Sequence, residues 1–163
     1  MGGENKLLLE IDGVPVLART LSAFQKCAAI RDIVLVCREQ DIMPYTELAK
    51  AFSIDKLCTV TRGGETRTES VLAGITAAPE NAVLVAVHDG ARPLISPDLI
   101  AHTIATLKGN IDCDGAVVAH PAVDTLKVVE NGVIVGTPDR RVFWNAQTPQ
   151  VFRAGIYRRA HAS

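Results

Sequence analysis

The chain has 163 residues, of which 48% are hydrophobic and only 4% aromatic, and its formal net charge is −1. This length provides one domain with a sizeable core, and an aliphatic composition is typical of helices packed on a parallel sheet. The small net charge and the lack of any basic run exclude a basic surface of the kind that binds nucleic acid. No apolar run is long enough to span a membrane, and the first residues do not have the pattern of a signal peptide.

The cysteines and histidines do not have the spacing of a metal site. Cys27, Cys37, Cys58 and Cys113 are dispersed and form no CxxC pair. In a chain of this size they predict reduced, mostly buried thiols in a cytoplasmic protein rather than a disulfide framework or a zinc site. The four histidines are scattered as well, so no metal is assigned to the side chains of the protein.

Helices and strands alternate along most of the chain. Short apolar runs predict the strands, and apolar stripes of helical period predict the helices. This β–α alternation predicts an α/β fold, Rossmann-like, with a mostly parallel sheet flanked by helices. In chain order we expect a helix over 14–25, a strand over 32–37, a helix over 44–52, a strand over 56–61, a helix over 66–77, a strand over 82–87, a helix over 97–108 and a strand over 115–119.

Two of these helices carry clear start signals. Thr66 and Glu69 have the spacing of a capping box. Ser96 and Pro97 suit the N-cap and the first turn of the next helix. These local signals predict where both helices begin.

The alternation breaks over residues 123–142, where two strand-like runs flank Asn131-Gly132. Asn-Gly is the strongest short hairpin signal, so we expect a β-hairpin arm over this range. The arm either caps the sheet or projects from it, and a projecting arm would need a partner to cover its apolar side chains. Those side chains are Leu126, Val128, Val133 and Val135.

Polar residues end the clearest strand, in the stretch VHDGARP (87–93). Ligands of open α/β sheets bind outside the carboxyl ends of the strands, and Asp89 stands at that end. Gly90 would allow a ligand or backbone to come close, and Arg92 offers a planar fork for phosphate or carboxylate. The plainer alternatives are that Asp89 is a turn residue and that Arg92 forms a surface ion pair.

Two further loops follow predicted strands and carry polar residues. One is TRGGETRTES (61–70), where Gly63-Gly64 precedes a helix N-terminus that could attract an anion. The other is AHPAVDTLK (119–127). A pair of glycines is by itself usually only a turn, and Glu69 alone is only a cap. Together the three strand ends predict a polar site for an anionic, phosphorylated small molecule.

Five motifs in this order resemble one family over essentially the whole chain. The set is similar to the 2-C-methyl-D-erythritol 4-phosphate cytidylyltransferases of the non-mevalonate isoprenoid pathway. The pentitol-phosphate cytidylyltransferases share several of the motifs, but the spacing from Asp139 to Trp144 favours the methylerythritol family. The motifs are GGENKLLLEIDGVPVLARTL (2–21), GGETRTESVLAG (63–74), LVAVHDGARPLIS (84–96), VDTLK (123–127) and DRRVFWNAQTPQVF (139–152).

The resemblance implies a reaction and a set of site residues. A phosphate oxygen of methylerythritol phosphate attacks the α-phosphorus of CTP, pyrophosphate leaves, and Mg²⁺ neutralises the triphosphate. Lys6 would stabilise the transition state, although without the resemblance it would be taken for a surface lysine. Arg140 would position the methylerythritol phosphate. The implied nucleotide-binding residues are Gly64, Glu65 and Ser70, and the implied substrate-binding residues are Asp89, Arg92, Thr125 and Thr148.

The resemblance also implies a homodimer in which the arm reaches the partner, so that Thr125 and Arg140 serve the neighbouring site. Family members have a central strand and a glycine-rich loop before the position of Met1, and a further segment after that of Ser163. We therefore expect one nucleotidyltransferase domain over 1–163 that is incomplete at both ends. Two other functions stay open: a ribitol 5-phosphate cytidylyltransferase, and a non-catalytic remnant that dimerises or binds nucleotide.

Overall fold

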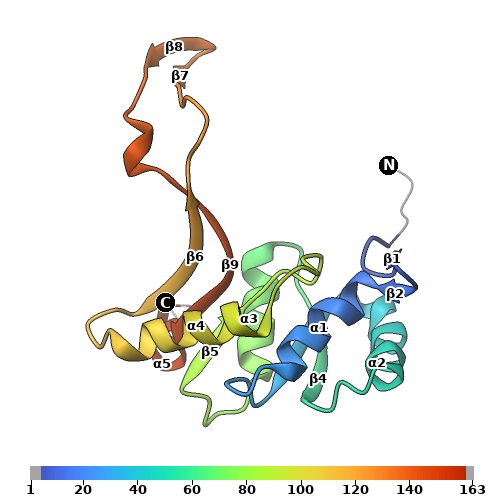
Figure 1. The fold of residues 1–163 in the computed structure, drawn as a ribbon. Helices are drawn as coiled ribbons and strands as arrows, with labels where there is room; N and C mark the ends of the chain where they lie inside the picture. The colour runs from blue at the N-terminus through green and yellow to red at the C-terminus, as the bar shows by residue number, and fades with distance from the viewer. Residues whose placement is uncertain (1–4, 161–163) are drawn as a thin grey trace.

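The computed structural model describes residues 5–160 and contains two main groups of strands (Figure 1). β3 (Ile33–Cys37) and β4 (Leu57–Arg62) pair in parallel. A second sheet has the order β5-β9-β6, and β9 runs antiparallel to both neighbours. Its strands are β5 (Leu84–Val87), β6 (Gly115–Pro121) and β9 (Trp144–Arg153).

The helices pack on these strands and enclose an aliphatic core. Leu17, Ile100, Leu107 and Val151 are fully buried in it. The helices are α1 (Val16–Lys26), α2 (Ile42–Ala51), α3 (Arg67–Ala77), α4 (Pro97–Gly109) and α5 (Ala154–Ala160), with short 3₁₀ turns at Glu39–Asp41 and Arg140–Val142 and a two-residue pair of strands, β1 (Glu10–Ile11) and β2 (Val14–Pro15).

The local start signals are confirmed. The Thr66 hydroxyl accepts a hydrogen bond from the Glu69 amide at 3.1 Å, and the Glu69 carboxylate accepts one from the Thr66 amide at 3.1 Å. The Ser96 hydroxyl accepts from the Leu99 amide at 3.2 Å, and Pro97 is the first residue of α4. Each cap satisfies amides that the helix cannot pair internally, which explains why α3 and α4 begin where they do.

The α/β class and the parallel pairing of β3 with β4 are confirmed, but the sequence did not predict β9. This strand inserts between β5 and β6, so that the pairings in the second sheet are antiparallel rather than parallel. Its sequence, WNAQTPQVFR, is half polar and includes Pro149, which cannot donate to a strand ladder. Its pairing with β6 is irregular at this point, since Val117 pairs with Gln150 and Ala119 with Ala146.

The two groups of strands do not pair with each other in the described chain, and a cavity of about 670 Å³ lies along β3 and β5. Residues of α1 and α3 also line it. The four residues of β5 are all only half-buried, which is unusual for an apolar strand within a sheet.

The hairpin forms as predicted and projects from the body (Figure 1). β7 (Val128–Glu130) and β8 (Val133–Gly136) flank Asn131 and Gly132, whose φ angles of 49° and 80° are those of a two-residue type I′ turn. Val128, Val133 and Val135 are exposed and Leu126 is half-buried. Cover from a partner chain stays a prediction.

Candidate active site

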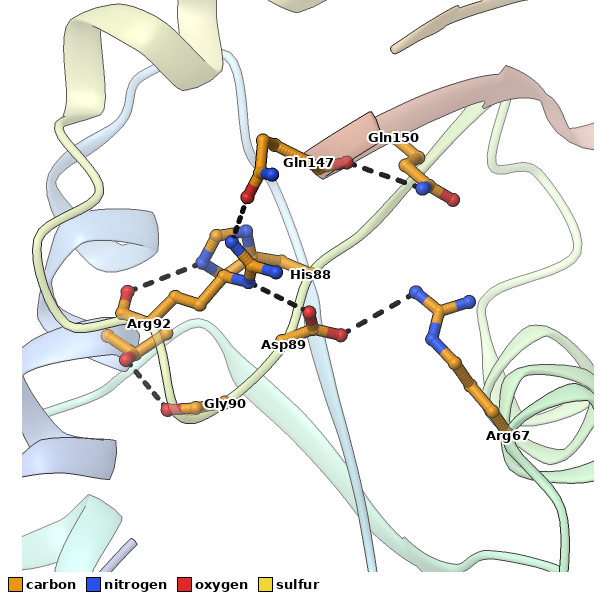
Figure 2. A network of polar contacts seen from close by, with 8 residues as sticks. Arg67, His88, Asp89, Gly90, Arg92, Gln147 and Gln150 are labelled. Atoms are coloured by element: carbon orange, nitrogen blue, oxygen red, sulfur yellow. Dashed lines mark hydrogen bonds and ion pairs between the residues drawn. The ribbon is translucent and has the colours of Figure 1, made fainter. Parts of the chain in front are cut away.

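The carboxyl end of β5 carries an ion-pair network centred on Asp89 (Figure 2). Arg92 Nε lies 2.9 Å from one oxygen of the Asp89 carboxylate, and Arg67 Nη2 lies 3.5 Å from the other. The Asp89 carbonyl also accepts from the Arg92 amide at 3.2 Å, so Asp89 is a turn residue as well. The network holds two cations and one anion at the edge where open α/β sheets bind ligands.

Contacts from β9 and α1 fix the loop that follows β5. Arg92 Nη1 donates to the side-chain oxygen of Gln147 in β9, and the Gln147 carbonyl accepts from Gln150 Nε2 at 3.3 Å (Figure 2). The Thr20 hydroxyl, in α1, donates to the Gly90 carbonyl at 2.8 Å. The Arg92 guanidinium is therefore held in place by both Asp89 and β9.

No backbone of the described residues approaches Gly90 closely, and close approach of a ligand there stays a prediction. A Cβ built there would lie 3.4 Å from Leu17 Cδ1 and 3.6 Å from Leu7 Cδ2, which are ordinary contacts. Gly90 is also not among the glycines with positive φ, which within residues 5–160 are Gly13 and Gly132. The fold of this loop does not require a glycine at this position.

Replacing Gly90 by alanine should therefore raise the free energy of unfolding by about 0.4–1 kcal/mol, because alanine restricts the unfolded chain without straining the folded one. Urea titration of both proteins measures the difference. Gly132→Ala is the matched control: its φ of 80° should make the same change destabilising. A lower stability for Gly90→Ala would show that the loop does require glycine.

His88, the residue before Asp89, lies inside the same network. Its ring stands against Phe24 with centroids 5.1 Å apart, and Nε2 lies 3.5 Å from the Arg92 carbonyl. Nδ1 is buried without a hydrogen-bond partner among residues 5–160. Burial lowers the pKa of the imidazole, so His88 is neutral in the folded protein at pH 7.

This burial predicts a pH dependence of stability. The unfolded chain takes up a proton at His88 near pH ~6.5, whereas the folded chain does so only at lower pH. The contribution is thus fully present above that value and is lost as the pH falls towards the lowered folded pKa. Urea unfolding between pH 7.5 and 5 should show a shallower loss of stability in His88→Gln than in the parent. Equal slopes would contradict the burial argument.

The predicted nucleotide segment folds tightly against the start of α3. The Glu65 amide donates to the Glu69 carboxylate at 2.7 Å, and the Ser70 hydroxyl donates to the Gly64 carbonyl at 3.4 Å. A Cβ on Gly64 would lie 2.3 Å from Glu69 Cβ, and one on Gly63 would lie 2.6 Å from Ser70 Oγ. These close approaches require glycine, and Glu69 organises the loop as well as capping the helix.

The other predicted site residues lie in three places. Lys6 is exposed, and its neighbour Asn5 donates to the Tyr45 hydroxyl at 2.7 Å. Thr148 is 7% exposed, and its Oγ1 has no hydrogen-bond partner among the residues described. Thr125 and Arg140 belong to the arm.

Arg140 Nη1 donates to the Val123 carbonyl at 2.6 Å, within the arm itself. Asp89 and Arg92 are therefore in contact with each other. Within residues 5–160, no hydrogen bond or ion pair joins Lys6, Thr125 or Arg140 to this pair. The roles of all nine predicted residues stay predictions.

The structure also bears on the expectations about metals, thiols and membranes. Within residues 5–160, no three side chains of His, Cys, Asp or Glu are placed to hold a metal ion. Cys27, Cys37, Cys58 and Cys113 are all free thiols, although only Cys27 is fully buried. Over the same residues, every helix is too short or too polar to cross a membrane.

Comparison with known proteins identifies the family. The family model for 2-C-methyl-D-erythritol 4-phosphate cytidylyltransferase (IspD) matches residues 1–163. The chain belongs to this family. It is 40% identical over 162 residues to the enzyme of that name from Geobacter metallireducens, covering 96% of this chain and 68% of the relative. Over 159 residues it is 40% identical to the one from Bacillus licheniformis, covering 98% and 67%.

Solved structures agree with this assignment. The structure of 4-diphosphocytidyl-2C-methyl-D-erythritol synthase from Anaerococcus prevotii superposes with a TM-score of 0.82 at 29% identity, covering 94% of this chain and 68% of that one. The family's cytidylyltransferase from Thermus thermophilus superposes with a TM-score of 0.73 at 31% identity, covering 96% and 69%. The similarity therefore spans nearly the whole of this chain.

Sequence reasoning missed two residues of the network. Arg67 lies inside a quoted motif but was assigned no role, and Gln147 belongs to the unpredicted strand β9. The spacing of residues along the chain gives no signal for either contact, because each joins elements that are far apart in sequence.

Proposed function

We propose that the chain transfers a cytidylyl group from CTP to 2-C-methyl-D-erythritol 4-phosphate, giving CDP-methylerythritol and pyrophosphate. The observation that carries this proposal is the Asp89–Arg92 pair at the carboxyl end of β5, in a chain that the family model matches throughout. The four free thiols support a cytoplasmic location for this step.

The chemistry needs positioning and charge stabilisation rather than a covalent nucleophile. Arg92, held by Asp89 and Gln147, presents a preorganised cation to the anionic acceptor. The Asp89 carboxylate can accept hydrogen bonds from acceptor hydroxyls. The loop of Gly64 and Glu65 would hold the nucleotide, and the Lys6 ammonium would stabilise charge that develops on the α-phosphoryl group.

Mg²⁺, when bound, would neutralise negative charge on the triphosphate of CTP. The described side chains offer no cluster of three ligands, and Asp89 is shared between two arginines. This arrangement suits an ion that is ligated mainly by the phosphates of the nucleotide, as Mg²⁺ commonly is in phosphoryl-transfer sites. The protein would then contribute the surrounding cations and no dedicated metal cage.

The projecting arm supports a homodimer in which each site is shared. Val128, Val133 and Val135 are exposed on the arm and would be covered by a second chain. A two-fold pair of arms is self-complementary. Thr125 and Arg140 would then complete the acceptor pocket of the partner.

Pyrophosphate release tests the proposal. The purified chain is incubated with CTP, Mg²⁺ and either methylerythritol phosphate or ribitol 5-phosphate, with EDTA as the metal-free control. Release with methylerythritol phosphate, and its loss in EDTA, supports the proposal. Preference for ribitol 5-phosphate would show that a pentitol phosphate is the acceptor of this chain. CTP binding without pyrophosphate release in the presence of either acceptor would support a non-catalytic remnant.

A further inference from the structure

Arg67 stands between the two predicted subsites. It is the first residue of α3, two positions after Glu65 of the predicted nucleotide segment. Its guanidinium reaches the Asp89 carboxylate of the predicted acceptor pocket (Figure 2). Helix α3 packs on β3 and β4, whereas Asp89 follows β5 of the other sheet. The ion pair therefore links the two groups of strands at the mouth of the site.

The exposure of this pair argues against a role in stability. The Arg67 side chain is 58% exposed and that of Asp89 39%. Exposed ion pairs contribute little to stability, so neither residue is needed to hold the fold. The contact instead determines the orientation of the Asp89 carboxylate, because Arg67 and Arg92 each pair with one of its oxygens.

We propose that Arg67 is a positioning residue that couples the nucleotide segment to the acceptor pocket through Asp89. Held from both sides, the Asp89 carboxylate keeps a fixed direction towards the acceptor. A nucleotide that orders the 63–70 loop would also order Arg67, and with it Asp89. This inference rests on the proposed function, because it assigns the two subsites to the two substrates.

Arg67→Met tests the inference, since it keeps most of the apolar stem and removes the charge. The dissociation constant for methylerythritol phosphate, measured by calorimetry, should rise roughly 10-fold, and kcat should fall by up to about 10²-fold as the acceptor is misplaced. The dissociation constant for CTP should change less than twofold, the melting temperature should stay the same, and Arg67→Lys should recover part of the loss.

A matched control and a double-mutant cycle separate positioning from a general effect of charge. Arg31 is 62% exposed, pairs with Asp32 at 2.6 Å and donates to Asn81 at 2.7 Å. These residues precede β3 and β5, whereas Asp89 follows β5, so Arg31→Met should leave both dissociation constants unchanged. In an Asp89→Asn background, Arg67→Met should change acceptor binding and kcat little further, because the carboxylate through which Arg67 acts is already absent.

Three results would overturn the inference: additive losses in the cycle, equal weakening of CTP and acceptor binding, or no change in acceptor binding. Acceptor binding by the parent without pyrophosphate release would overturn only the proposed function, because the calorimetric cycle does not depend on turnover. No acceptor binding by the parent would overturn both.

Discussion

Replacing Lys6 by alanine should lower kcat for cytidylyl transfer by about 10²–10³-fold, the usual loss when one preorganised charge at a developing anion is removed. The ammonium would act mainly in the transition state, so the dissociation constant for CTP should change much less. Steady-state pyrophosphate release gives kcat, and calorimetry with CTP gives the dissociation constant.

The position of Lys6 makes this result specific. Its neighbour Asn5 is tied to Tyr45 at 2.7 Å and to Asp41 at 3.2 Å, which fixes the backbone from which the exposed ammonium extends. Lys50→Ala is the matched control, because this lysine is exposed on α2 and pairs with Glu47. An unchanged kcat in Lys6→Ala would show that Lys6 is only a surface residue.

Asp89→Asn should reduce turnover by at least about tenfold while the melting temperature stays normal. The substitution keeps the size of the side chain but removes the charge that holds Arg67 and Arg92. Both guanidinium groups then lose the carboxylate that they share. The hydroxyl groups of the substrate lose a charged oxygen to which they can donate hydrogen bonds. Stability is preserved because the pair is exposed.

Turnover assays and thermal melts on the same preparation measure both quantities. Asp32→Asn is the control, since Asp32 also pairs with an arginine but lies before β3, away from the site. Full activity in Asp89→Asn would mean that Asp89 serves only the turn in which its carbonyl accepts from the Arg92 amide.

The parts of the fold that the sequence predicted are those that local chemistry determines. The capping box of Thr66 and Glu69, the Ser96 cap and the Asn131-Gly132 turn each act within a few residues, so the sequence pattern is sufficient. Strand β9 was missed because its polar residues and Pro149 carry no strand signal. Its place between β5 and β6 depends on pairing across the chain.

The site was predicted only in part for the same reason. Asp89 and Arg92 are three residues apart, and their contact follows from one turn. Arg67 and Gln147 reach the network from α3 and β9, and only the tertiary structure brings them there. Close approach of a ligand to Gly90 stays a prediction, and the room for a Cβ there depends on Leu7 and Leu17, which come from distant parts of the chain.

The central claim is that the site is shared, with Lys6 acting in its own subunit and Arg140 acting in the partner. Mixing Arg140→Ala chains with Lys6→Ala chains tests it most directly. In a mixed dimer, one site would then have both residues and the other would have neither. Random exchange makes about half of the dimers mixed, so about a quarter of the parent activity should return. No recovery, with mixed dimers verified by mass, would contradict the claim and place Arg140 in the site of its own subunit.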